Sequence, residues 1–211
     1  QHIYMIKQPS LSKGLGNQKE TEQFYDNWSL DYEKTLNNWN YKAPLKSSKI
    51  LQKYIKKKPR LVLDLACGTG LFAEKIKKNY KNSIIDGSDI SKKSLKIANS
   101  KNLYRHLYKI SFNNIHPLKN KYDLVSLIGA MTYCKNHFDF LNNVLLHLKK
   151  NGYFIFTQRT DLWIKYDFDN LLSQYSKNFN LVYKSKSLEY LPRNKDFSKK
   201  IKMRIVLLKK N

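Results

Sequence analysis

The chain has 211 residues, a length that fits one domain with a substantial hydrophobic core. No apolar run reaches the roughly 18 residues of a membrane span, and no basic-then-apolar signal pattern is visible. Its only cysteines are Cys67 and Cys134, too few for a disulfide framework. We therefore expect a protein of the reducing cytoplasm with no membrane span.

The formal net charge of +24 is large enough to suit a nucleic-acid or anionic membrane partner. Only five of the 40 basic residues are arginine, however, and arginine is preferred for bidentate phosphate contacts. The lysines are spread along the whole chain, which is typical of compositional bias on a solvated surface. We expect non-specific attraction to polyanions at low salt and no specific nucleic-acid partner.

The N-terminal part divides into two segments by composition. Residues 1–20 are polar and predict a flexible lead-in, while residues 21–211 form a single domain. Residues 21–58 are helical in pattern and rich in aromatic residues. Tyr25, Trp28 and Tyr32 could share one helical face, so this segment predicts a lid over a site, although core packing is the alternative for its aromatic rings.

From residue 59 onward, strand and helix patterns alternate. Strands are predicted at 61–65, 83–85, 104–112, 122–128 and 153–157, and helices at 71–78, 91–100, 138–150 and 167–176. Two closing strands, at 181–185 and 201–208, form an antiparallel excursion. This order predicts an α/β fold with a Rossmann-like, doubly wound, seven-stranded sheet, mostly parallel with one antiparallel strand near the C-terminus.

The strongest local signal is Asp64-Leu-Ala66-Cys67-Gly68-Thr-Gly70, a turn of small residues between a buried strand and a helix. Glycines can adopt positive φ and let a ligand approach the backbone closely. Asp64 ends the strand with an acceptor suited to an ammonium group. In an open α/β sheet, the crevice beyond the strand ends is the usual ligand site.

A second acidic signal ends the next strand, in Ile-Ile-Asp86-Gly-Ser-Asp89-Ile90. A carboxylate at this place can accept hydrogen bonds from both hydroxyls of a ribose. We favour Asp89, because a helix begins immediately after it. Asp86 is the alternative and is expected to be structural and to point outward.

The glycine-rich turn resembles the cofactor motif of class I S-adenosylmethionine-dependent methyltransferases. Residues 89–98, 122–125 and 148–157 resemble the later motifs of that family in order and spacing, so the likeness spans about residues 22–160. Residues 24–32, 41–44 and 157–160 resemble a narrower group, the methyltransferase-like proteins that include the one from the Williams–Beuren syndrome region.

The resemblance implies S-adenosylmethionine as cofactor and S-adenosylhomocysteine as product. It implies that the turn passes beneath the methionine part, Asp64 faces the amino group and Asp89 holds the ribose. Where many relatives carry an acidic residue for adenine, this chain offers Ser111 and Phe112. The complete set of expected cofactor-binding residues is Tyr25, Trp28, Tyr32, Asp64, Ala66, Cys67, Gly68, Gly70, Asp89, Ile90, Ser111, Phe112, Ile128 and Gly129.

Methyl transfer from a sulfonium is an in-line displacement, in which alignment supplies most of the acceleration. A general base is needed only when the acceptor arrives protonated; Tyr133 and His137 are the candidates. Tyr133, Arg159 and Trp163 are expected to line the acceptor pocket. No spacing of His, Cys and carboxylates indicates a metal site.

We expect methyl transfer to a small molecule by a monomer or weak homodimer. The alternatives are an RNA methyltransferase, favoured only by charge, and a protein that binds or cleaves the cofactor without methylating. The fourth strand is followed by apolar Ile128-Gly-Ala-Met, which offers no stack for a flipped base.

Overall fold

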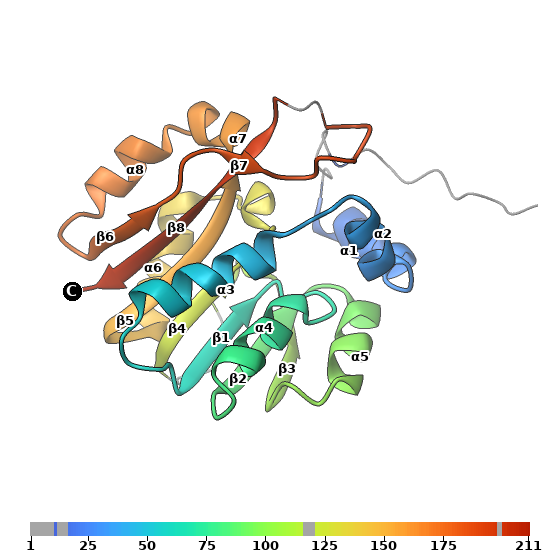
Figure 1. Ribbon diagram of the computed structural model, residues 1–211, viewed down its shortest axis with the longest axis horizontal. Coiled ribbons are helices and arrows are strands. Elements are labelled where there is room, and N and C mark those ends of the chain that lie inside the picture. Colours follow the sequence, from blue (N-terminus) through green and yellow to red (C-terminus); the bar gives the residue numbers. More distant parts are fainter. Residues whose placement is uncertain (1–10, 12–16, 116–120, 198–199) are drawn as a thin grey trace, which may run out of the picture.

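The computed structural model describes residue 11 and residues 17–115, 121–197 and 200–211. These residues fold around one sheet with the strand order β3-β2-β1-β4-β5-β8-β6 (Figure 1). In that order the strands are His106–Lys109, Ile84–Asp89, Leu61–Leu65, Tyr122–Leu127, Leu148–Arg159, Lys202–Lys210 and Phe179–Lys184. A further two-residue strand, β7 (Leu188–Glu189), pairs with β8.

The direction of the strands confirms the predicted fold class. Strands β1 to β5 pair in parallel, whereas β8 pairs antiparallel with both β5 and β6. Strand β6 therefore runs with the majority, and β8 is the reversed strand of the main path. The predicted number of strands is exceeded by one, because the short β7 was too brief to show a period in the sequence.

Helices cover both faces of the sheet (Figure 1). Helices α3 (Ala43–Tyr54) and α4 (Leu71–Asn79) pack with one set of strand side chains, which includes Val62 and Leu124. The adjacent positions Leu63 and Val125 point to the other face, against α6 (His137–His147) and α8 (Phe168–Gln174). Alternate residues of a strand point to opposite faces, so the strands are apolar throughout.

Three helices flank this core. Helix α5 (Lys92–Ser100) follows β2 and packs beside β3, with Ser91 as its N-cap. Helices α1 (Gln18–Trp28) and α2 (Tyr32–Asn38) lie beyond the strand ends, and α1 contacts α5 (Figure 1). Helix α1 thus begins inside the predicted lead-in, of which Leu11 and residues 17–20 are described. Across the described residues, no helix is both long and apolar enough to cross a membrane.

Two differences from the predicted elements have local causes. The helix predicted over 138–150 ends at His147, because Leu148 is already extended (φ −84°, ψ 137°) and starts β5. Helix α7 (Thr160–Lys165) was not predicted; it has six residues and is too short for a helical period to appear. It follows β5 directly and brings Trp163 into the core.

Asp86 is structural, as expected, but it points inward. Its side chain is fully buried, and it accepts hydrogen bonds from Arg105 Nε (3.0 Å), Arg105 Nη2 (2.5 Å) and Tyr122 Oη (2.8 Å). The outward prediction was wrong because these partners lie 19 and 36 residues away in sequence. A buried carboxylate with paired donors ties β2 to β4 and to the start of β3.

We therefore expect Asp86→Ala to lower the free energy of unfolding by about 2–4 kcal/mol, because it leaves buried donors unsatisfied. Urea unfolding followed by circular dichroism measures this change. Glu189→Ala, on an exposed position of β7, is the control and should stay within about 0.5 kcal/mol of the parent. Equal stability of the two variants would show that the Asp86 cluster is not structural.

Candidate functional site

A tight turn connects β1 to α4 at the carboxyl end of the sheet. Ala66, Gly68 and Gly70 adopt φ values of +50°, +54° and +93°, and Gly70 is the N-cap of α4. An ideal Cβ on Gly68 would stand 3.9 Å from the ring of Tyr32. A Cβ would therefore meet this ring at an ordinary contact distance, and it is the positive φ that favours glycine at this position.

Asp89 joins this turn to the end of β2. Its Oδ2 accepts a hydrogen bond from the Gly68 amide at 2.9 Å, and its Oδ1 accepts one from the Ser91 amide at 2.8 Å. Burial raises the pKa of the carboxyl, and the backbone hydrogen bonds partly offset that rise. Each carboxylate oxygen keeps acceptor capacity for a ligand hydroxyl.

A cavity of about 220 Å³ opens above these groups. A water molecule needs about 10–15 Å³ on the same measure, so the cavity admits a far larger ligand. Many of the residues expected from the sequence line it together: Tyr25, Tyr32, Ala66, Gly68, Asp89, Ile90, Ser111, Phe112, Ile128, Gly129 and Tyr133. The two strand ends singled out in the sequence thus face one common space.

Asp64 and Cys67 border a smaller adjoining hollow beneath Tyr32 and Tyr41. Asp64 accepts hydrogen bonds from Ser126 Oγ at 2.7 Å and Tyr104 Oη at 2.8 Å. Burial raises the pKa of Asp64 to about 6, although both hydroxyls act to lower it. Asp64 is therefore a buried acceptor whose charge can be stabilised further by a cation.

The cavity also has walls that the sequence did not single out. In the loop after β3, Asn113 follows the expected Ser111 and Phe112 and lines the cavity with them. Asn113 Nδ2 donates to the Tyr133 carbonyl at 3.0 Å, and its Oδ1 accepts from the Lys135 amide at 2.9 Å. This link between the loops after β3 and β4 is a long-range contact that no local sequence pattern could reveal. The other unpredicted lining residues are Asn17, Gln18, Thr21, Ser94, Ile110, Ala130, Thr132, Cys134 and Lys135.

Helices α1 and α2, which we call the lid, cover the cavity through aromatic contacts. Tyr25 Oη and Tyr133 Oη are 2.8 Å apart in a hydrogen bond, and the Tyr25 ring meets the edge of the Tyr32 ring at 6.2 Å. Trp28 lies behind them, stacked on Tyr25 at 6.0 Å and buried against Phe24. Tyr25 and Tyr32 line the cavity, whereas Trp28 supports them from the second layer of the lid.

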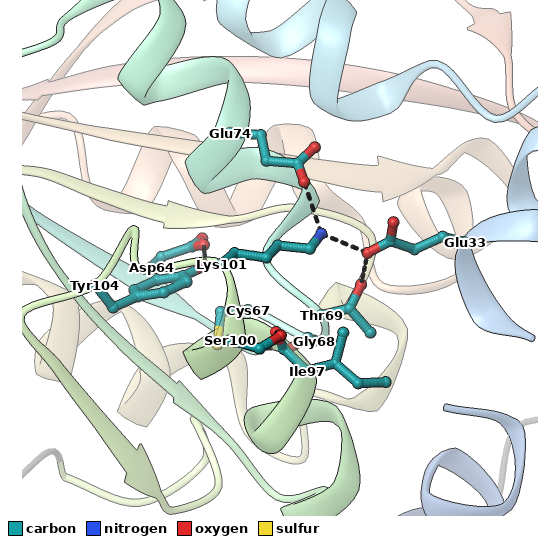
Figure 2. A network of polar contacts seen from close by, with 10 residues as sticks. All are labelled: Glu33, Asp64, Cys67, Gly68, Thr69, Glu74, Ile97, Ser100, Lys101 and Tyr104. Carbon is teal, nitrogen blue, oxygen red and sulfur yellow. Dashed lines mark hydrogen bonds and ion pairs between the residues drawn. The ribbon is translucent and has the colours of Figure 1, made fainter. Parts of the chain in front are cut away.

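A polar network fastens the lid to the turn (Figure 2). Glu33 of α2 accepts a hydrogen bond from Thr69 Oγ1 at 2.6 Å and pairs with Lys101 Nζ at 2.5 Å. Lys101, at the end of α5, also pairs with Glu74 of α4 at 2.7 Å (Figure 2). Glu33 of α2 and Glu74 of α4 therefore meet at the Lys101 ammonium, and Thr69 of the turn joins them through Glu33; we call this network the latch.

A second contact fastens α1 to α5. Asp26 accepts hydrogen bonds from Ser91 Oγ at 2.6 Å and from the Lys93 amide at 3.1 Å, at the N-terminus of α5. A carboxylate is favoured there by the unpaired amides and the helix dipole. Ser91 follows Asp89 closely, so the lid is anchored beside the predicted ribose carboxylate.

Trp28, Asp64, Cys67 and Arg159 border the adjoining hollows instead of the 220 Å³ cavity, and three further expected residues line none of these spaces. His137 borders a separate apolar hollow, with its ring 4.9 Å from those of Tyr166 and Phe168, and burial lowers its pKa. Trp163 is buried in the core, and its Nε1 donates to Asp169 at 2.9 Å. Gly70 is the N-cap of α4, and a Cβ on it would stand 3.2 Å from the ring of Tyr104.

Arg159 and Tyr133 do come together, around a second hollow on the far side of Tyr25 and Tyr133. Burial raises the pKa of Tyr133, so its hydroxyl keeps its proton at neutral pH. Within the described parts of the chain, no group of His, Cys, Asp and Glu has the arrangement of a metal site.

The strand order defines an α/β protein. Its glycine turn and the carboxylate that ends β2 border a cavity of the kind that binds a nucleoside, at the carboxyl edge of the sheet.

A family model described as a methyltransferase domain matches residues 63–154. An uncharacterised protein of Methanocaldococcus jannaschii, MJ0638, is 30% identical over 192 residues, which cover 82% of this chain and 80% of that protein. The chain belongs to the class I S-adenosylmethionine-dependent methyltransferases.

Human methyltransferase-like protein 27 is 29% identical over 124 residues, in agreement with the narrower resemblance. The match covers 56% of this chain and half of the human protein's length. Among solved structures, the plantazolicin methyltransferase BpumL in complex with SAH superposes with a TM-score of 0.61. It shares 18% identity and covers 92% of this chain and 90% of its own, which shows a common fold.

We expect Lys101→Met to weaken the closed state of the lid, because Glu33 and Glu74 then lose their shared cation. Each pair is partly exposed, so a modest effect is expected, about a 2- to 5-fold faster dissociation of S-adenosylhomocysteine. Stopped-flow tryptophan fluorescence measures the rate. Lys19→Met, which changes an exposed lysine of α1, is the control, and equal rates in both variants would exclude a latch at Lys101.

Proposed function

We propose that the chain binds S-adenosylmethionine in the 220 Å³ cavity and transfers its methyl group to a small molecule. The observation that carries the proposal is the hydrogen bond between Gly68 and Asp89, which brings the turn and the carboxylate to one cavity. In this proposal the product of the cofactor is S-adenosylhomocysteine. The enzyme works in the cytoplasm as a monomer or weak homodimer.

The residues around the cavity fit this cofactor chemically. Asp89 offers free acceptor capacity toward a diol, and Gly68 holds the turn beside it with a φ of +54°, which L side chains rarely adopt. Asp64 is a buried acceptor suited to an ammonium group. Ile90, Ser111 and Phe112 form the wall for the base, with Phe112 supplying an apolar ring.

When bound, S-adenosylmethionine would supply an electrophilic methyl group for in-line displacement by the acceptor, with a neutral thioether as the leaving group. The chain contributes alignment, which can lower a barrier by about 7–11 kcal/mol in well-oriented systems. Tyr25 and Tyr32 exclude water from the space above Gly68. Tyr133 keeps its proton and orients the acceptor through its hydroxyl rather than acting as a base.

A narrow space beside the cavity favours a small acceptor over a nucleic acid. The space next to the cavity, between Tyr133 and Arg159, measures about 30 Å³ and is walled by aromatic rings. The structural neighbour BpumL is a plantazolicin methyltransferase, a precedent for acceptors outside nucleic acids on this fold. The net charge of +24 is the observation that favours an RNA substrate. A surface of solvated lysines is sufficient to account for this charge.

Calorimetry with S-adenosylhomocysteine tests the proposal. Asp89→Ala should weaken binding by about 10- to 100-fold, because hydrogen bonds to a charged acceptor are lost. Asp31→Ala removes an exposed lid carboxylate that caps no helix amide, and it should bind like the parent. Unchanged affinity in Asp89→Ala, or no binding by the parent chain, would refute the assignment.

Asp64 makes the affinity depend on pH. Because burial raises its pKa to about 6, the side chain is largely neutral below that pH and cannot pair with a ligand ammonium. Affinity for S-adenosylhomocysteine should therefore rise between about pH 5 and about pH 7, by up to about tenfold per unit below the pKa. Asp64→Asn should flatten most of this rise, leaving the smaller part from Asp89, whose pKa is also raised by burial. Parallel curves for parent and variant would exclude an ammonium partner for Asp64.

A further inference from the structure

A second hollow adjoins the proposed cofactor cavity, and we call it the acceptor hollow. It shares Tyr25, Tyr32, Gly129, Thr132 and Tyr133 with the larger cavity, so these residues form a common wall between the two. Its volume of about 30 Å³ corresponds to about two or three water-sized positions. The hollow therefore has room for a small polar group rather than for a whole ligand.

Arg159, the last residue of β5, supplies the one charged side chain among the described residues that line this hollow. The residue is only 6% exposed, and its guanidinium carbon lies 5.0 Å from the centre of the Phe197 ring. Nε and Nη2 donate to Asp161 at 3.0 and 2.5 Å. A guanidinium has five N–H donors, so donors remain for a second acceptor after Asp161 has taken two.

Tyrosine hydroxyls complete the lining. Tyr25 and Tyr133 bond to each other, whereas the hydroxyls of Tyr32, Tyr41 and Tyr190 have no hydrogen-bond partner among the residues that the structure describes. Burial raises the pKa of all five, so each remains a protonated donor at neutral pH. No carboxylate among the described residues lines the hollow.

A buried space that offers an arginine and several hydroxyl donors, with no acidic side chain, is complementary to an anionic acceptor group. We propose that the acceptor hollow binds a carboxylate of the methyl acceptor, with Arg159 as its partner; this proposal rests on the function proposed above. The substrate class is then a small carboxylic acid. Its remaining part extends past Tyr25 and Tyr133, which places the nucleophile at the cofactor cavity and leaves the anchored carboxylate unmethylated.

A carboxylate fits this hollow better than a phosphate does. A phosphate monoester carries about −1.5 to −2 charges at neutral pH and three acceptor oxygens. Arg159 is a single cation and is already paired with Asp161, so a dianion leaves more uncompensated negative charge in this hollow than a carboxylate does.

Saturation-transfer NMR on the full chain, saturated with S-adenosylhomocysteine, tests the proposal with simple probes. The probes are acetate, hexanoate and benzoate, each compared with its amide, and phenyl phosphate. We expect the acids to bind and the amides to bind far more weakly. Arg159→Gln should weaken acid binding by about 10- to 100-fold, and Tyr190→Phe, which removes only a hydroxyl, by about 3- to 10-fold.

Controls separate this proposal from the loss of the fold. Arg60→Gln changes an exposed arginine at the opposite end of β1 and should leave acid binding unchanged. The double variant Arg159→Gln/Asp161→Asn removes both charges of the pair and leaves no unpaired carboxylate, and its melting temperature reports on folding. In both Arg159 variants, calorimetric affinity for S-adenosylhomocysteine should match that of the parent.

Several outcomes would overturn the carboxylate assignment. The first is equal binding of acids and amides, and the second is acid binding that survives in the folded Arg159 variants and in Tyr190→Phe. The third is tighter binding of phenyl phosphate than of benzoate. The last is no acid binding at all by a chain that binds S-adenosylhomocysteine. That last result would leave the proposed function intact. Failure of S-adenosylhomocysteine to bind the parent chain would instead refute the proposed function itself.

Discussion

The hydrogen bond from the Gly68 amide to Asp89 links two parts of the chain on which the whole site depends. Gly68 lies in the turn after β1, and Asp89 ends β2, the neighbouring parallel strand. The parallel register brings the two strand ends to the same edge, and the carboxylate then fixes the turn in its positive-φ conformation. This bond therefore holds the turn and the proposed ribose-binding carboxylate at a single cavity.

The lid depends on the same arrangement. Asp26 is held beside Asp89 through Ser91, while Glu33 is held beside the turn through Thr69 and Lys101 (Figure 2). Both contacts use charged groups at helix ends or on partly exposed side chains, so each is individually weak. We propose that several weak contacts of this kind let the lid open for exchange of ligands.

Local patterns in the sequence were sufficient for the fold class and for much of the cavity. The turn from Ala66 to Gly70 and Asp89 could be found because strand, small residues and helix follow one another within the motif itself. Contacts between distant segments were not visible in this way. The latch at Lys101 and the hydrogen bonds of Asn113 join residues far apart in sequence. Asp86 likewise points inward because its partner Arg105 comes from a distant part of the chain. For the same reason His137 and Trp163, expected beside the site from their place after β4 and β5, lie in apolar surroundings away from the cavity.

A crystal structure of the chain grown with S-adenosylhomocysteine tests the central claim most directly. The account predicts electron density in the cavity below Tyr25 and Tyr32, with the ribose hydroxyls on Asp89 and the amino group nearest Asp64. Density for the ligand at any other place, or side chains closing the space between Gly68 and Asp89 with the ligand in excess, would contradict it.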